Sequence, residues 1–228
     1  MTLDTLLQRA DIWRGDRLTT GIKAVPSGFA ELDALLPGGG WPQGALTEIM
    51  MPRQGIGALR LLMPTLAQLS QGDRWICWVA PPHIPYAPAL ANAGIDLSRI
   101  LLVHPRGQQD GLWAVEQSLR SGNCAAVLAW PTLDDKAILR RLQLAAESGD
   151  ALGVLFRPRH FVQRPSAAAL RIELAAEIDG SLSVSILKRR GGWAVGPVHL
   201  DTYLQTDGAL ALHSGAATAT GNFQSRWQ

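Results

Sequence analysis

The stretch of residues 46–63 limits the folds open to this chain more than any other. It begins with an apolar run, continues through a turn that carries Gly55 and Gly57, and ends in an apolar segment with helical spacing. This order of strand, tight turn and helix is typical of α/β domains, where a central strand leads into a helix that packs back on the sheet. The sequence therefore predicts an α/β fold built around this unit.

The turn has the outline of a phosphate-binding loop without the groups that bind phosphate. Such a loop follows G-x-x-x-x-G-K-[ST]: its glycines expose backbone N–H groups, its lysine reaches the outer phosphates, and its hydroxyl ligates magnesium. The best alignment places non-matching residues at these positions: Met51 and Ile56 at the glycines, Gly57 at the lysine and Ala58 at the hydroxyl, with Gly55 beside them. An ordinary glycine turn also fits. We expect a vestigial nucleotide loop, no cofactor, no metal and no ATPase activity.

Length and composition favour one globular domain. The chain has 228 residues, of which 47% are hydrophobic and 18% charged, enough for a single substantial core. No apolar run is long enough to span a membrane and the first residues lack a signal-peptide pattern, so we expect a cytoplasmic protein. Cys77 and Cys124 lie in apolar runs, which indicates reduced, buried thiols. The net charge of +2 is too small to imply general nucleic-acid binding.

The composition divides the chain into three parts. Residues 1–20 predict an amphipathic helix and a linker, residues 21–204 the folded domain, and residues 205–228, rich in Gly, Ala, Ser and Thr, a flexible tail. The apolar side of the first helix either docks on the domain or binds another protein. Its candidate partner-binding residues are Leu3, Leu6, Leu7 and Trp13.

Apolar runs and turns predict the elements of the domain. Continuous apolar runs at residues 75–80, 124–130 and 151–156 predict strands that are covered on both faces. Residues 58–70 predict a helix that Pro64 kinks or shortens. After residue 168, three further segments separated by glycine turns predict an antiparallel meander.

Two basic clusters are candidates for binding nucleic acid or an acidic protein surface. The first surrounds Phe161 and the second ends a predicted hairpin. A solvated surface loop explains them equally well. The candidate residues are Arg157, Arg159 and Arg164 in the first cluster, and Lys188, Arg189 and Arg190 in the second.

Residues 27–49 resemble the segment that leads into the nucleotide loop of RecA-like recombinases. They contain S-G-x-x-x-L-D, G-G-x-P-x-G and a final E-I. The resemblance implies a RecA-like P-loop NTPase-type core, a mostly parallel sheet flanked by helices with C-terminal antiparallel strands. It also implies degenerate Walker motifs, because Pro82 falls nearest the place of the catalytic glutamate and Trp130 takes that of the magnesium-holding aspartate.

Within that group the chain resembles the ImuA family of translesion DNA synthesis-associated proteins, which shares its central part with the division inhibitor SulA. The matching segments are residues 61–69, 74–81, 121–130 and 152–158. This resemblance implies a non-catalytic accessory protein of SOS-induced translesion synthesis. Its implied partners are RecA, ImuB and the error-prone polymerase complex, with single-stranded DNA as a further candidate.

The alternative is a SulA-like SOS inhibitor of cell division that binds the tubulin-like protein FtsZ. Residues 61–158 are compatible with both families. The lead-in at residues 27–49 and the strands predicted after residue 168 favour ImuA, because SulA is shorter and lacks most of both.

Overall fold

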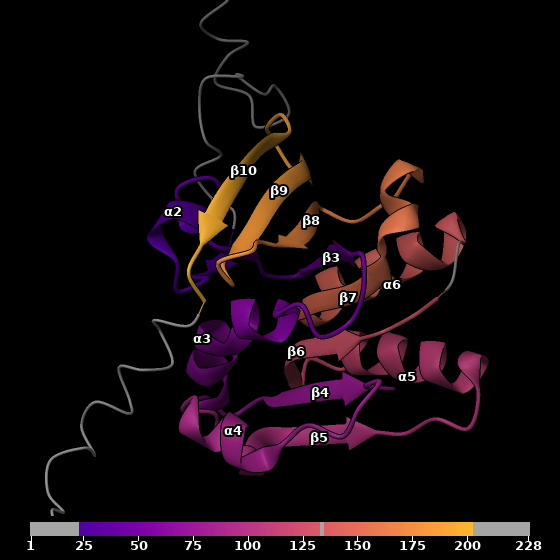
Figure 1. Ribbon diagram of the computed structural model, residues 1–228. Coiled ribbons are helices and arrows are strands. Elements are labelled where there is room, and N and C mark those ends of the chain that lie inside the picture. The colour runs from indigo at the N-terminus through magenta and orange to yellow at the C-terminus, as the bar shows by residue number, and fades with distance from the viewer. Residues whose placement is uncertain (1–22, 133–134, 203–228) are drawn as a thin grey trace, which may run out of the picture.

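The computed structural model describes residues 23–132 and 135–202 of the chain. These residues form one large sheet with helices on both faces, and a small two-stranded sheet beside it (Figure 1). The strands of the large sheet are β3 (Ala45–Met51), β4 (Trp75–Val79), β5 (Ile100–Val103), β6 (Cys124–Ala129), β7 (Leu152–Pro158), β8 (Leu170–Ala176), β9 (Leu182–Arg189) and β10 (Val195–Leu200). The small sheet pairs β1 (Ala24–Val25) with β2 (Trp41–Pro42).

The large sheet has the strand order β10-β9-β8-β3-β7-β6-β4-β5. β3 lies between β7 and β8 and is parallel to both, and every one of its residues is buried. Such burial on both faces explains why hydrophobic residues do not alternate with exposed polar ones in this strand, whose two polar residues, Thr47 and Glu48, are buried too. In this register Ile49 lies opposite Phe156 of β7 and Ile172 of β8.

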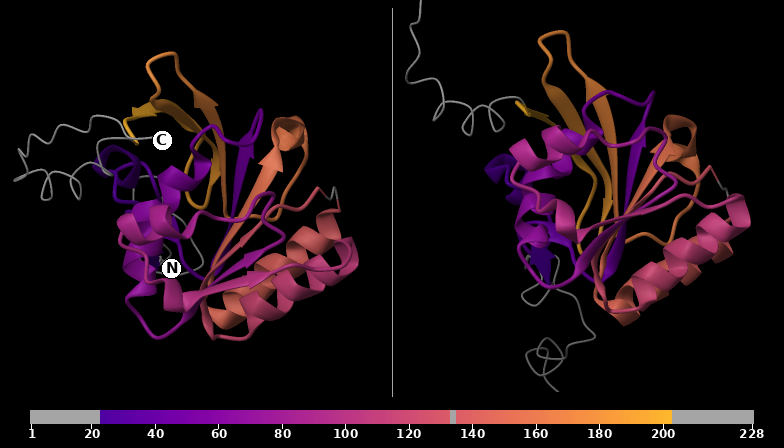
Figure 2. Two further views of the ribbon diagram at one scale, coloured as in Figure 1. Left: turned by 60° about the horizontal axis from the view of Figure 1, so that its bottom comes forward. Right: turned by 90° about the horizontal axis from the view of Figure 1, so that it is seen from below.

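The helices cover the two faces of the sheet and enclose two separate cores (Figure 2). The helical elements are α2 (Ala30–Asp33), α3 (Ala58–Ser70), α4 (Ala87–Asn92), α5 (Gln108–Arg120), α6 (Lys136–Gly149), and the short 3₁₀ turns η1 (Leu97–Arg99) and η2 (Arg159–Gln163). α2, α3 and α4 contribute to one core, and α5 and α6 to the other. The N-terminus of α6 is capped by Asp135, whose carboxylate accepts hydrogen bonds from the N–H groups of Ala137 and Ile138.

The structure corrects the predicted shortening of the helix at Pro64 and confirms the predicted meander. α3 runs from Ala58 to Ser70 without a break, although Pro64 lies inside it. Burial of Leu62 and Leu66 in the core beside it holds this helix together despite the missing proline N–H. The last three strands form the predicted antiparallel meander: β8 is antiparallel to β9 and β9 to β10, and β8 joins the rest of the sheet parallel to β3.

The predicted fold class, a RecA-like P-loop NTPase-type core, is corrected to an α/β fold with a mixed sheet. The sheet combines parallel strands with the antiparallel strands β9 and β10, and few helices flank it. The turn between β3 and α3 supplies neither a lysine nor a hydroxyl. A strand, a glycine turn and a helix occur in many α/β folds, so this pattern alone did not justify the specific class.

Parts of the sequence prediction lie outside the described residues. These are the amphipathic helix with Leu3, Leu6, Leu7 and Trp13, and the tail of residues 205–228. Among the described residues, no helix combines the length and the apolar character needed to cross a membrane.

Candidate functional site

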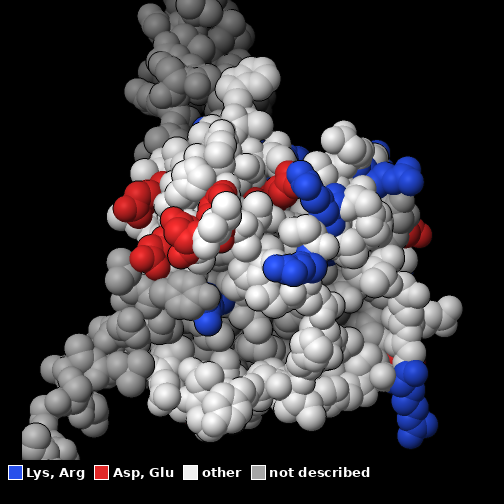
Figure 3. All heavy atoms as spheres, in the orientation of Figure 1, with Lys and Arg blue, Asp and Glu red and all other residues white. Residues whose placement is uncertain are grey.

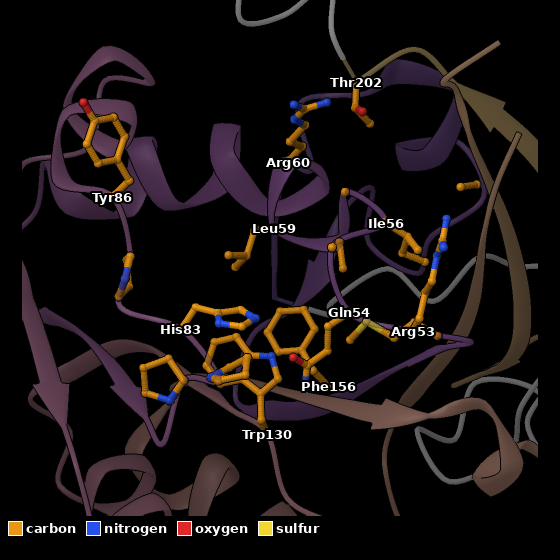
Figure 4. Close-up of a pocket in the computed structure, with 18 of the residues that line it drawn as sticks. Arg53, Gln54, Ile56, Leu59, Arg60, His83, Tyr86, Trp130, Phe156 and Thr202 are labelled. Atoms are coloured by element: carbon orange, nitrogen blue, oxygen red, sulfur yellow. The ribbon is translucent and has the colours of Figure 1, made fainter. Parts of the chain in front are cut away.

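A cavity of about 490 Å³ opens at the carboxyl edge of the sheet, where β3, β4 and β7 end (Figure 4). Its wall is formed by the turn between β3 and α3, the loop that follows β4, and the turn between β8 and β9. The predicted vestigial loop contributes all five of its residues to this wall: Met51, Gly55, Ile56, Gly57 and Ala58. The volume lies in the range of sites that hold small molecules or single anchoring side chains.

Aromatic side chains from three strands form the floor of the cavity. Trp130, just after β6, stacks on Phe156 of β7 with ring centroids 4.6 Å apart and ring planes 14° apart. Trp78 of β4 lies beside Trp130, with centroids at 6.1 Å. The indole Nε1 of Trp78 is buried and has no hydrogen-bond partner among the described residues. The floor is therefore apolar, and Trp130 is its one partly exposed ring, since Phe156 and Trp78 are almost completely buried.

Positive charge surrounds the opening. Arg53 lies in the β3–α3 turn and Arg60 in the first turn of α3, and both side chains are exposed. Figure 4 shows Arg60 across the opening from Trp130 and Phe156, with Arg53 to one side. His83 also borders the cavity, and the described lining residues include no Asp or Glu.

The glycine turn points the start of α3 at this opening. Gly55 and Gly57 have φ values of 81° and 99°, a region that favours glycine. Gly57 is the N-cap residue of α3; no side chain caps this helix, and its first turn has no acidic residue. The positive end of the helix dipole therefore adds to the charge of Arg53 and Arg60.

The positions implied for ATP hydrolysis carry no suitable groups. Pro82 and Trp130 both line the cavity, and neither side chain can accept a proton or ligate magnesium. His83 is exposed on the loop beside Pro82, where the described residues bring no carboxylate to orient it. No lysine occurs among the described lining residues.

Arg157 belongs to the interior and not to a basic surface. It is 1% exposed, and its Nη1 pairs with the carboxylate of Glu48, which is fully buried in β3. The Nε of Arg171 in β8 pairs with the other carboxylate oxygen at 2.7 Å. The Cζ of Arg157 also lies 4.0 Å from the centroid of the Phe161 ring, a cation–π contact. This group, Arg157–Glu48–Arg171, is called the buried triad below.

The other predicted basic residues are spread over the surface and are mostly engaged within the chain. Their contacts are Arg159 with Glu173, the Lys188 ammonium with the backbone oxygen of Ser166 at 2.9 Å, Arg189 with the backbone oxygens of Leu35 and Trp193, and Arg190 with Glu147 at 3.5 Å; Arg164 is exposed. Burial lowers the pKa of Lys188. On the face in Figure 3, basic side chains are scattered among neutral ones, and some adjoin acidic ones.

The two cysteines are free and buried, as expected, but they are also neighbours. Cys77 of β4 and Cys124 of β6 lie on adjacent parallel strands. A hydrogen bond from the Cys124 thiol stabilises the Cys77 thiolate and lowers the pKa of Cys77 to about 7, while the same contact raises the pKa of Cys124. The two cysteines lie far apart in the sequence, so their contact could not be predicted from it.

Sequence reasoning also missed the residues that give the cavity its character. Arg53, Arg60 and Trp78 were not singled out. One signal was available: the two arginines flank the glycine turn in a segment, residues 49–72, that contains no acidic residue. A second signal was available for the buried triad: a carboxylate inside a buried strand, such as that of Glu48, requires a partner of opposite charge.

Comparison with known proteins identifies the family. Residues 44–153 match the family model "Cell division inhibitor SulA". The chain is 37% identical over 116 residues to "Cell division inhibitor SulA" of Photorhabdus laumondii, covering 50% of this chain and 65% of that protein. For the Cronobacter sakazakii protein of the same name the identity is 33% over 120 residues, covering 51% of this chain and 70% of that one. The crystal structure of SulA from Pseudomonas aeruginosa aligns with a TM-score of 0.42 and 29% identity, covering 49% of this chain and 97% of that one.

These matches correct the assignment made from sequence. Residues 61–158 were compatible with both families, and ImuA was preferred because of residues 27–49 and the strands predicted after residue 168. The family model that matches, over residues 44–153, is that of SulA. The predicted role in translesion synthesis, and the predicted partners RecA, ImuB, the polymerase complex and single-stranded DNA, are therefore withdrawn. The chain spans less than two thirds of the Photorhabdus protein but 70% of the Cronobacter one. Because the chain is 33% identical to the Cronobacter protein over an alignment that covers 70% of that protein, it belongs to the SulA family.

Proposed function

We propose that this protein is a non-enzymatic inhibitor of cell division in the SOS response, and that it acts in the cytoplasm by binding the tubulin-like division protein FtsZ. The observation that supports this most is the 33% identity over 70% of a protein named as a cell division inhibitor. The cavity at the carboxyl edge of the sheet also fits a binding role, since its floor is aromatic and its rim carries no catalytic pair of side chains.

Controlled expression in growing bacteria tests the proposal. Cells that produce the chain are expected to become filamentous and to lack division rings, because an inhibitor that binds the ring-forming protein stops septum formation while growth continues. Extra FtsZ should restore division by mass action. Cells carrying the empty vector are the control. Normal cell length at a level where the chain is readily detected would contradict the proposal.

Purified protein is expected to hydrolyse no more ATP than a protein-free blank. The reason is local: Gly57 and Ala58 supply no ammonium or hydroxyl group to the turn, and Pro82 supplies no base. Phosphate release with ATP and magnesium measures this. Turnover above the blank that a Gly57→Ala substitution removes would show that the turn is catalytic after all.

A further inference from the structure

We propose that the predicted N-terminal helix of this chain packs with its apolar side against a groove on its own domain. The groove lies between β4, β5 and the end of α5, at the edge of the large sheet where these parallel strands begin. This contact is within one chain, so the proposal does not depend on the proposed function.

The groove is a part of the sheet face beside α5 that the described residues leave open. It has a volume of about 710 Å³, and both Trp75 of β4 and Leu101 of β5 line it. Trp75 lies on the same side of β4 as Cys77, which is opposite Leu101 and belongs to the core under α5 and α6. The side chains of Trp75 and Leu101 are nevertheless 40% and 44% exposed. Two large apolar side chains on one face of the sheet therefore remain open to water among the described residues.

The groove also lies along an edge of the sheet. β5 is the outermost strand on its side (Figure 1), so its outer backbone groups have no partner strand among the described residues. An apolar strand at an open edge can pair with other chains and aggregate, and proteins commonly cover such an edge with a helix or a loop. A segment beyond the described residues is the natural cover for this one.

The chain enters the described fold beside the groove. The ammonium group of Lys23, the first described residue, pairs with the carboxylate of Asp150 at 3.2 Å. The backbone oxygen of Asp150 accepts a hydrogen bond at 2.9 Å from Arg74, which lines the groove. The linker of residues 15–22 can extend to about 25 Å, enough to bring the predicted helix from Lys23 to the groove.

The predicted helix has an apolar side that suits the groove. Its large apolar side chains recur at helical spacing, which places them on one side: Leu3, Leu6, Leu7 and Trp13. Packing this side against Trp75 and Leu101 would remove apolar surface of both elements from water, the dominant favourable term in such a contact. The length of the linker and the position of Lys23 allow the contact to form within one chain.

The C-terminal segment is a less suitable occupant. The last described residue, Thr202, lines the cavity at the opposite edge of the sheet, where β3 and β4 end. The strand before it, β10, lies at the other end of the sheet from β5. The N-terminal segment starts beside the groove, and the C-terminal one does not.

Hydrogen exchange of the full chain, followed by mass spectrometry, tests the proposal. The backbone amides of residues 2–14 are expected to exchange on the order of a hundredfold more slowly than those of an unstructured peptide, because docking keeps their helical hydrogen bonds closed. Leu101→Ser should lower this protection about tenfold, since the helix would lose most of one buried leucine contact. Leu102→Ser is the matched control. Leu102 is 38% exposed but faces the other side of the sheet, so its loss should leave the protection unchanged.

A second pair of variants changes the helix itself. Leu7→Asp places a carboxylate on the apolar side and should abolish the protection of residues 2–14. Gln8→Asp introduces the same residue on the polar side and should retain it, so the pair separates docking from helix propensity. Denaturant unfolding of all four variants should match that of the unaltered chain to within the effect of the docked helix, which shows that the domain is folded.

Three outcomes would overturn the proposal. The first is exchange of residues 2–14 at the rate of an unstructured peptide in the unaltered chain. The second is an equal effect of Leu101→Ser and Leu102→Ser, which would place the helix away from the groove. The third is protection that rises with protein concentration together with a dimer in sedimentation, which would place the helix on a second copy of the chain.

Discussion

Glu48→Gln is expected to lower the free energy of unfolding by about 3–5 kcal/mol, because it removes the only carboxylate of the buried triad. Arg157 and Arg171 would remain charged inside the protein, where the cost of desolvating them is no longer offset. The glutamine oxygen can still accept one hydrogen bond, but it carries no charge. Denaturant unfolding measures the change.

Glu116→Gln is the matched control for this substitution. Glu116 also pairs with two arginines, Arg120 and Arg141, but their side chains are 49% and 53% exposed. Water can solvate these arginines when the carboxylate is lost, so the expected cost is about 1 kcal/mol or less. Equal losses at Glu48 and Glu116 would show that the triad is less isolated from water than the structure describes.

Replacing the whole triad distinguishes a need for charge from a need for filled volume. Glu48→Leu combined with Arg157→Met and Arg171→Leu leaves no buried charge and retains much of the side-chain volume. Such replacements are often neutral or stabilising, so the triple variant should be more stable than Glu48→Gln alone. The opposite order would mean that hydrogen bonds from Arg171 to the backbone oxygens of Phe161 and Val162 contribute more than the charges do.

Gly149→Ala is expected to cost about 2–3 kcal/mol, the upper part of the range for inserting a methyl group into a packed interior. Gly149 ends α6 where it meets α5, and a Cβ atom there would lie 2.0 Å from the backbone oxygen of Leu119. A backbone oxygen cannot rotate away as a side chain can, so the two helices would have to separate. Thermal or denaturant unfolding gives the measurement.

Gly72→Ala is the matched control, since the nearest atom to its Cβ, the Leu69 oxygen, lies at the ordinary contact distance of 3.5 Å. Its effect should be within about 0.5 kcal/mol of zero. If Gly149→Ala were equally harmless, the close approach of α5 and α6 would be looser in solution than in the structure.

Arg157 shows why residue type alone was misleading about the candidate site. Its basic, aromatic-containing neighbourhood in the sequence suggested a surface for anions, whereas β7 places it directly beside β3 and Glu48. A charged side chain pairs with whatever the neighbouring strand presents, and that strand lies more than a hundred residues away. The family assignment was wrong because residues 27–49 and the strands after residue 168 were used to prefer ImuA, whereas the matches found are to SulA.

The sequence by itself determined the local features: the glycine turn after the buried strand β3 and the apolar character of strands β4 and β6. These depend on residues within a few positions of one another. Only the tertiary structure decided that Trp78, Trp130 and Phe156 share one floor, and that Arg53 and Arg60 line the same cavity. The physical reason is that parallel strands distant in the chain end at the same edge of a sheet, and their order and register are set by long-range packing.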